Sequence, residues 1–307
     1  MIETFLLVAI IGLQLAILAY LVRMARNLGT KATTQHQRTL SELKYLRAST
    51  TGTLVSQFLP SSPALHDVNW DHVIALTSYG ARLQTLASSL KSILNQRLIP
   101  KKIYLVLTQS DFESLPKTAK EIIDSPSFEV HISEDLGPGK KLLPILSKNP
   151  DLPIITFDDD LIYPTDLTLR LMIQHQLNPD CIIANRVHKV KYLEDGRPAP
   201  YESWEKNYSL GDGPEVNFLA TSGAGTLFKA EHFHPDVLDT DAYKELSLYT
   251  DDLWWFVQSR RIGTKVKRLP GISELNYIDG TQEDGLWLSG NKTRNDENLA
   301  KLWSRYF

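Results

Sequence analysis

Short apolar runs alternate with helical segments between residues 68 and 176 of this 307-residue chain. The intervening segments carry apolar residues at helical spacing, as Leu83, Leu86 and Leu90 do. Strands that alternate with helices of this length form βαβ units, whose parallel strands share one sheet. The sequence therefore predicts an α/β fold with a mostly parallel, Rossmann-like sheet flanked by helices. The strand-like runs are HVIALTSYG (72–80), KKIYLVLT (101–108), FEVHIS (128–133) and LPIITFDDD (152–160).

An apolar run from Phe5 to Val22, interrupted only by Gln14, lies near the start of the chain. With a rise of about 1.5 Å per residue, such a helix nearly spans a bilayer core of about 30 Å. The preceding MIET contains no Lys or Arg, whereas a signal peptide has a basic start. A buried core helix is the alternative, but we expect residues 1–26 to form a single transmembrane anchor.

The flanking charges and composition then suggest an order of parts. Arg23, Arg26 and Lys31 follow the apolar run and no basic residue precedes it, which predicts a cytoplasmic location for the remainder. Residues 27–67 are polar and rich in turn residues, so we expect a stalk or linker. The catalytic domain is then expected over residues 68–307.

Charge and cysteine content exclude two classes of protein. The formal net charge of −3 lacks the basic excess of a nucleic-acid-binding protein, so we expect no nucleic-acid partner. Cys181 is the single cysteine, which excludes an internal disulfide framework and favours a reducing compartment.

Three adjacent aspartates, Asp158 to Asp160, follow the apolar run that ends at Phe157. In an extended chain alternate side chains share a face, which would orient Asp158 and Asp160 together and Asp159 away from them. Two carboxylates on one face repel unless a cation screens them, and Mg²⁺ or Mn²⁺ prefers such oxygen ligands. The pattern predicts a metal shared with a phosphorylated ligand; the alternative is an acidic turn that caps the next helix.

The order of motifs resembles that of GT-A-fold nucleotide-sugar glycosyltransferases, in particular family-2-like enzymes of bacterial surface-polysaccharide synthesis. The resemblance covers roughly Val68 to the C-terminus. The motifs that carry it are VIALTSYGARLQTLASSLKSILNQRLIPKKIYLVL, LGPGKKLLPIL, PIITFDDDLIYP, TSGAGTLF and TDDLWWFVQSRRIGTKV. It implies sugar transfer from a UDP- or GDP-sugar to a saccharide or lipid-linked saccharide, with inversion favoured and Mn²⁺ or Mg²⁺ as cofactor. The Gln-x-x-Arg-Trp motif of processive synthases is absent and one membrane span is expected, so we expect transfer of one sugar rather than polymerisation.

The resemblance also implies roles for particular residues. Asp158 and Asp160 match the metal-binding DxD positions, with Asp159 between them in the cofactor-binding loop. Asp252, and after it Asp251, match the acidic pair that supplies the base. The residues implied to contact the donor are Thr77, Ser78, Arg82, Asp111, Gly223 and Gly225.

Several of these residues also have simpler interpretations. Asp251 and Asp252 suit the first turn of a helix, where carboxylates are favourable without any catalytic role. Lys140 and Lys141 follow a glycine-rich turn that opens a helix, so they either meet a phosphate or lie in solvent. The segment NRVHKVKY (185–192) offers His188 and two lysines to an anionic group, although a lone histidine is more often structural.

Two other functions remain open. A nucleotidyltransferase on a related sheet would also use acidic residues and a metal, but LTSYGARL is a poor match to the Gly-rich basic loop such enzymes carry. A non-catalytic, membrane-tethered binding protein would retain the fold without the chemistry.

Overall fold

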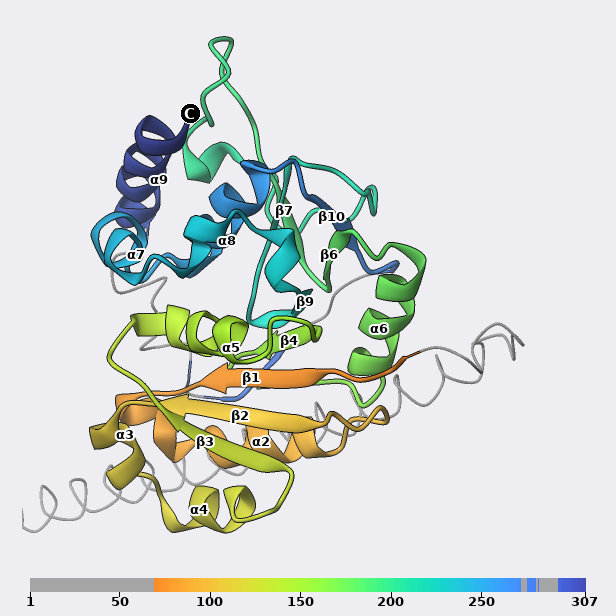
Figure 1. Ribbon diagram of the computed structural model, residues 1–307, viewed down its shortest axis with the longest axis vertical. Coiled ribbons are helices and arrows are strands. Elements are labelled where there is room, and N and C mark those ends of the chain that lie inside the picture. Colours follow the sequence, from red (N-terminus) through yellow and green to blue (C-terminus); the bar gives the residue numbers. More distant parts are fainter. Residues whose placement is uncertain (1–68, 272–274, 280, 282–291) are drawn as a thin grey trace, which may run out of the picture. The chain divides into compact units, whose positions relative to one another are not determined.

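A seven-stranded sheet in the order β10–β6–β9–β4–β1–β2–β3 forms the centre of the computed structural model (Figure 1). The structure describes residues 69–271, 275–279, 281 and 292–307. The four predicted strands are confirmed as the first four of the sheet, and three more come from the second half of the chain. The strands are β1 (Val73–Thr77), β2 (Lys102–Leu107), β3 (Phe128–Ile132), β4 (Ile154–Phe157), β6 (Cys181–Ala184), β9 (Ala224–Phe228) and β10 (Lys265–Arg268).

Six of the seven strands run in one direction, which confirms the mostly parallel sheet. Strand β9 is the exception, because it pairs antiparallel with both β4 and β6. In consequence Ala224, at the start of β9, lies opposite Phe157, at the end of β4. The loop that precedes β9 therefore lies beside the aspartates that follow β4.

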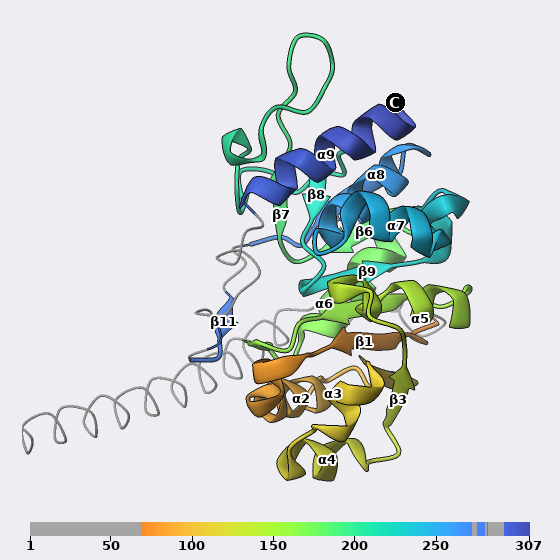
Figure 2. The same cartoon turned by 90° about the vertical axis from the view of Figure 1, so that its left-hand side faces the viewer.

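Helices cover both faces of the sheet (Figures 1 and 2). Along β1, Val73 and Ala75 belong to one apolar core while Ile74 and Leu76 belong to the other, as the period of two requires. Because both faces are buried, the strand sequences are apolar throughout. One core includes residues of α2 (Leu86–Leu94), α4 (Lys117–Ile123) and α6 (Leu167–Leu177), and the other those of α5 (Leu143–Lys148), α7 (Thr240–Ser247), α8 (Asp251–Arg260) and α9 (Lys292–Tyr306).

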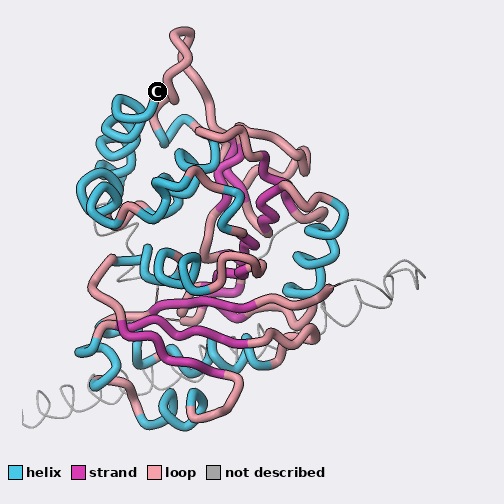
Figure 3. Tube along the Cα trace, viewed as in Figure 1, coloured by secondary structure: helices cyan, strands magenta, loops and turns pink. Residues whose placement is uncertain are grey.

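Two predicted helices are each preceded by a separate 3-10 turn. Figure 3 shows how helices and strands alternate along the described chain. The predicted segment 139–149 contains Pro144, which fits the first turn of a helix but not its interior. Helix α5 accordingly begins at Leu143, and the residues before it form η3. The 3-10 turns are η2 (Gly80–Gln84), η3 (Gly137–Lys141), η4 (Tyr201–Ser203), η5 (Ala230–His232) and η6 (Pro235–Leu238).

Short elements complete the carboxyl edge of the sheet. Strand β5 (Leu161–Ile162) pairs antiparallel with β11 (Asn276–Tyr277), and β7 (Val187–Lys189) pairs antiparallel with β8 (Phe218–Ala220). Helix α3 (Gln109–Glu113) directly follows β2.

No helix in the described part of the chain is long and apolar enough to cross a bilayer. The predicted anchor at Phe5–Val22 and the predicted stalk at 27–67 lie outside the described residues. Both therefore stay predictions.

Gly225 provides a test of packing between β9 and α6. Its φ of +95° is unfavourable for other residues, and an added Cβ would lie 2.8 Å from Leu167 Cδ2. Gly263 has a comparable φ of +75° but open space around its α-carbon. We expect Gly225→Ala to lower the free energy of unfolding by roughly 3–4 kcal/mol, because strain and overpacking add.

The matched control Gly263→Ala should cost only about 1–2 kcal/mol, since it introduces backbone strain alone. Urea unfolding measured by circular dichroism gives both values. Equal losses in the two variants would show that the contact with Leu167 is unimportant.

Candidate functional site

The carboxyl ends of β1, β2 and β4 meet at one edge of the sheet, as the parallel register requires. Thr77 lies opposite Val106, and Ala75 opposite Thr156. Open α/β sheets bind ligands outside such an edge. The chain therefore gathers most of the predicted site residues here, although they are distant in sequence.

Lys141 lies at the centre of this cluster. Its ammonium donates to Asp158 Oδ1 at 2.6 Å and to Ser222 Oγ at 3.3 Å, and lies 3.5 Å from Asp251 Oδ2. Burial alone would lower the pKa of Lys141, but the surrounding carboxylates outweigh it and raise that pKa. Lys141 is therefore a buried cation that joins the aspartate cluster after β4 to the acidic pair of α8.

Arg82 binds the other two aspartates of the cluster. Its Nη1 donates to Asp159 Oδ1 at 2.8 Å and its Nη2 to Asp160 Oδ2 at 3.1 Å. The expectation that Asp158 and Asp160 share a face is wrong here, because residues 159 and 160 form a turn and strand alternation no longer applies. Asp159 and Asp160 instead share one guanidinium, and Asp158 faces Lys141.

The loop before β9 holds Asp158 in place. The hydroxyl of Tyr163 accepts from Asp158 N at 2.7 Å and donates to Gly223 O at 2.6 Å. A Cβ on Gly223 would overlap the Asp158 carboxylate. Glycine is thus required at position 223 because the carboxylate rests directly on its α-carbon.

Asp251 and Asp252 open α8 as predicted, but they have different surroundings. Asp251 is buried, and its Oδ2 accepts from Ser222 Oγ at 3.1 Å and from Trp255 Nε1 at 3.4 Å. Asp252 is partly exposed, and its Oδ1 accepts from Ser222 N at 2.8 Å. Asp251 is therefore held within the protein, while Asp252 is accessible to a ligand.

The pKa of Asp252 is raised to about 7. Burial of the carboxyl group is the main cause and the negative charge of Asp251 adds to it, against the opposing pull of Lys141 and Ser222. A carboxylate with a pKa near neutrality suits a general base. Helix capping alone, the simpler interpretation of this pair, would not raise the pKa in this way.

The charge of the cluster fits a bound divalent cation. Among the described residues, the carboxylates of residues 158–160 and 251 form ion pairs with Arg82 and Lys141, and Asp252 adds a fifth acidic group beside them. Asp158 has a side chain 36% exposed, so it is accessible to an ion. Within the described residues no three acidic, His or Cys side chains form a complete metal site. A divalent ion at this place would need water or phosphate oxygens to complete its coordination.

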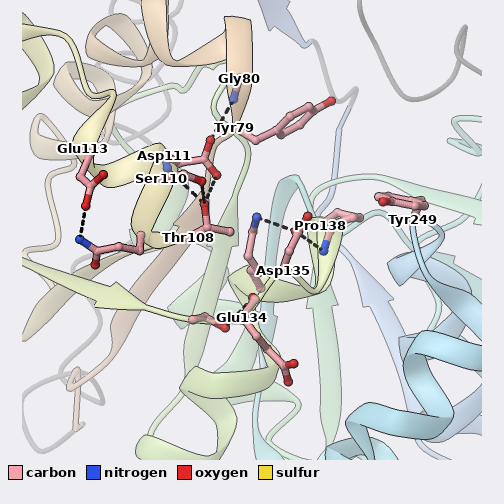
Figure 4. A pocket seen from close by; sticks show the side chains of 14 residues that line it. Tyr79, Gly80, Thr108, Ser110, Asp111, Glu113, Glu134, Asp135, Pro138 and Tyr249 are labelled. Atoms are coloured by element: carbon pink, nitrogen blue, oxygen red, sulfur yellow. Dashed lines mark hydrogen bonds and ion pairs between the residues drawn. The ribbon is translucent and has the colours of Figure 1, made fainter.

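A cavity of about 830 Å³ opens where β1 and β2 end (Figure 4). Tyr79, Asp111 and Lys140 are among its lining residues. Asp111 accepts from Gly80 N at 3.1 Å and from Thr108 Oγ1 at 2.7 Å, so it ties the two strand ends together. Lys140, almost completely buried, pairs with Asp135 at 3.0 Å. We call this the first cavity.

A second cavity, of about 420 Å³, contains Asp252. Tyr249 lines both cavities and therefore stands between them. Tyr249 and Asn207 have positive φ values, +69° and +50°, and among the described residues they are the non-glycine residues that do so. Both line the second cavity. Backbone strain of this kind gathers at functional sites.

His188 also lines the second cavity, as a neutral group. Burial, followed by the charges of Arg186 and Lys206, lowers its pKa to about 3. Its Nδ1 accepts from Asn207 N at 3.1 Å, so the ring proton lies on Nε2. His188 is thus a hydrogen-bond donor rather than a cation.

Three predicted donor contacts lie elsewhere than expected. Thr77 is buried, and its hydroxyl donates to Val106 O at 2.7 Å. Ser78 is buried beside Asp159, where burial raises the pKa of that carboxyl group and Arg82 and Ser78 oppose the rise. Gly225 packs against Leu167 rather than lining a described cavity. These three residues support the site from within the fold.

No protein-family model and no curated protein matches this sequence. Among solved structures, the chain is similar to 4-diphosphocytidyl-2C-methyl-D-erythritol synthase from Anaerococcus prevotii, with a TM-score of 0.44 and 15% identity over 75% of this chain and 98% of that one. It is also similar to S. aureus TarS 1–349, with a TM-score of 0.46 and 15% identity over 77% of this chain and 71% of that one. The complex of TarS 1–349 with UDP gives a TM-score of 0.42 and 15% identity over 67% and 59% of the two chains. Similarity of this extent assigns no function.

Sequence reasoning missed several residues that shape the site. Tyr163, Ser222 and Tyr249 hold or line it through contacts with segments distant in sequence. Ser222 lies within the motif TSGAGTLF, in which the resemblance implies a role only for the two glycines. Tyr249 directly precedes the motif TDDLWW, and this position is the one feature of the sequence that could have pointed to it.

Removing the Lys141 ammonium should strongly destabilise the protein. Lys141→Met leaves the buried carboxylate of Asp251 and the partly exposed carboxylate of Asp158 without their cation, so we expect a loss of about 3 kcal/mol in the free energy of unfolding at pH 7. Lys148→Met removes a partly exposed pair with Glu129 and should cost less than about 1 kcal/mol. Urea unfolding at pH 7 would refute the assignment if the two losses were equal.

The raised pKa of Asp252 predicts a pH-dependent stability. The ordinary pKa is 3.8 and that in the folded state about 7, so the folded protein disfavours the ionised form. Between these pH values the wild type should lose stability relative to Asp252→Asn, by about 1 kcal/mol or more, and the difference should level off above pH 7. Below about pH 4 the difference should vanish.

Unfolding free energies measured between pH 4 and 8.5 test this expectation. Asp241→Asn is the matched control, because Asp241 is an exposed acid in the first turn of α7. An Asp252→Asn variant with the same pH profile as the control would contradict the raised pKa.

Proposed function

We propose that this protein is a metal-dependent, inverting glycosyltransferase that moves one sugar from a UDP- or GDP-sugar to a saccharide or lipid-linked saccharide. The observation that carries the proposal is the position of Asp252. Its carboxylate, with a pKa near 7, lines the second cavity and lies beside the carboxylates at the carboxyl edge of the sheet. The first cavity adjoins the second at Tyr249. This is the arrangement that sugar transfer requires of a base and a donor site.

The donor nucleotide is assigned to the first cavity. In this cavity the exposed ring of Tyr79 would stack on the nucleobase of the donor. The carboxylate of Asp111 lies at the same strand ends, where it would also contact the nucleotide. The diphosphate would lie between Lys140 and the Asp158–Asp160 cluster. The sugar would then lie beside Tyr249, where the two cavities adjoin.

In the proposed reaction, the Asp252 carboxylate takes the proton of an acceptor hydroxyl. That oxygen forms a bond to the anomeric carbon as the bond to the diphosphate oxygen breaks, and the nucleoside diphosphate leaves with the bonding electron pair. Attack from the side opposite the leaving group inverts the anomeric centre. Ser222 holds the acidic pair in place, because its peptide N–H donates to Asp252 and its hydroxyl donates to Asp251.

Asp158 and Asp160 are the residues proposed to hold Mn²⁺ or Mg²⁺. A divalent ion there would offset the negative charge that develops on the departing diphosphate. Lys141 and Arg82, which pair with Asp158 and Asp160, would orient these carboxylates toward such an ion.

Anchoring to a membrane by residues 1–26, with the catalytic domain in the cytoplasm, is part of the same proposal. An anchor would keep the enzyme close to a lipid-linked acceptor. The basic residues after the apolar run support this orientation.

Binding of the correct donor should raise the melting temperature of the purified protein. A ligand at 100 times its Kd stabilises the folded state by about 2.7 kcal/mol, which corresponds to roughly 5–10 °C for a domain of this size. We expect one UDP- or GDP-sugar to give this shift with Mn²⁺ or Mg²⁺ present and little without it. Thermal shift with a panel of nucleotide sugars measures it.

Asp158→Asn and Asp160→Asn should each abolish the metal-dependent part of the shift. Asp151→Asn is the control, because Asp151 is exposed at the opposite end of β4. Full shifts in both site variants would refute the metal assignment. Released nucleoside diphosphate distinguishes sugar transfer from nucleotidyl transfer, which releases pyrophosphate, and no binding of any nucleotide sugar would favour a non-catalytic protein.

A further inference from the structure

The second cavity, which Asp252 lines, adjoins a third cavity. The second cavity has a volume of about 420 Å³ and the third about 230 Å³. Arg186, Asn207 and Tyr277 line both. We call the two together the acceptor groove.

Arg186 is a cation without an acidic partner in this groove. Its Nε donates to Thr221 Oγ1 at 2.8 Å and its Nη1 to Tyr277 Oη at 3.4 Å, both neutral groups. In the part of the chain that the structure describes, no carboxylate lies within the 4.0 Å ion-pair distance of Arg186. A partly buried guanidinium that has only neutral partners has capacity for an anion.

Two more basic side chains line the groove on either side of Arg186. Lys206 lines the Asp252 side, with its Nζ 4.1 Å from the ring centroid of Tyr201 and 3.4 Å from Glu202 Oε1. Arg268 lines the other side, and its Nε and Nη2 donate to the carbonyls of Gly211 and Ser209. Positive charge therefore lies along the groove on both sides of Arg186.

We propose that the acceptor is a saccharide carrying an anionic group, a phosphate or a carboxylate, and that Arg186 binds this group while Asp252 faces the reacting hydroxyl. This inference rests on the proposed function. The planar guanidinium offers a fork of donors that matches both anions. A neutral saccharide would leave Arg186 without a counter-ion in the groove.

The position of Arg186 favours the acceptor over the donor as the source of the anion. The first cavity has its own cation, Lys140, and Tyr249 stands between that cavity and the groove. The charge of Arg186 also lowers the pKa of Asp158, after the larger effects of burial, Lys141 and Arg82. An electrostatic role toward Asp158 is thus the competing explanation, and it makes no use of the acceptor.

The test compares three sugars by ligand-observed NMR titration of the purified full chain. The probes are glucose 6-phosphate, glucuronic acid and glucose, with UDP and Mg²⁺ in excess so that the donor site is filled, and again without nucleotide. We expect both anionic sugars to bind at least about tenfold more tightly than glucose, because ionic hydrogen bonds are the strong ones. Equal binding of all three would overturn the proposal.

Variants then assign the effect to Arg186. Arg186→Gln should remove the preference and Arg186→Lys should retain part of it, with melting temperatures measured in parallel. Arg170→Gln is the matched control, because the Arg170 guanidinium also donates to a neutral acceptor, the carbonyl of Pro270, but lies on α6 and lines neither cavity of the groove. A preference that survives Arg186→Gln would overturn the assignment.

The remaining outcomes separate the sources of the anion. A tenfold loss of UDP affinity in Arg186→Gln, with the preference for glucose 6-phosphate intact, would place Arg186 in the donor site and overturn the proposal. If Arg186→Gln does not fold, Lys206→Gln should still reduce the preference for anionic sugars over glucose. The comparison of the three sugars in the wild-type protein then decides whether the groove binds an anion. A preference for anionic sugars in a protein that binds no nucleotide sugar would support the anion site and refute the glycosyltransferase.

Discussion

The buried ammonium of Lys141 is the contact on which the rest of the site depends. It joins Asp158, from the end of β4, to Asp251, from the start of α8, and touches Ser222 between them. Three segments far apart in sequence would otherwise bring like charges together without compensation. Because a buried ion pair is costly unless its geometry is good, these segments have little freedom to move relative to one another. The protein gains a fixed distance between the proposed donor and acceptor sites.

The antiparallel strand β9 makes this contact possible. A parallel strand in that place would put the loop before it at the opposite edge of the sheet. Because β9 runs against its neighbours, the Thr221–Gly223 loop lies beside the aspartates after β4. Asp158 rests on Gly223, and the peptide nitrogen of Ser222 binds Asp252. One reversed strand therefore brings the two acidic groups into one site.

Asp251 and Asp252 have different roles because they differ in burial. Asp251 is buried and interacts with Ser222, Trp255 and Lys141. Asp252 is accessible, and the negative charge of Asp251 beside it contributes to its raised pKa. The same logic applies to the cations. Lys141 and Arg82 are occupied by carboxylates, while Arg186 has neutral partners and is the one to which we assign a ligand. The strained residues Tyr249 and Asn207 line the cavity where these groups meet.

The sequence by itself determined the α/β class, the first four strands, the acidic start of α8 and most of the residues that gather at the carboxyl edge. Periodicity and motif order are local properties, so one chain was enough to recognise them. Only the tertiary structure decided which charge meets which. It paired Asp160 with Asp159 rather than Asp158, placed Thr77 and Gly225 in supporting roles, and added Tyr163, Ser222 and Tyr249 to the site. These outcomes depend on where a turn leaves a strand and on the direction of β9, which no local pattern records.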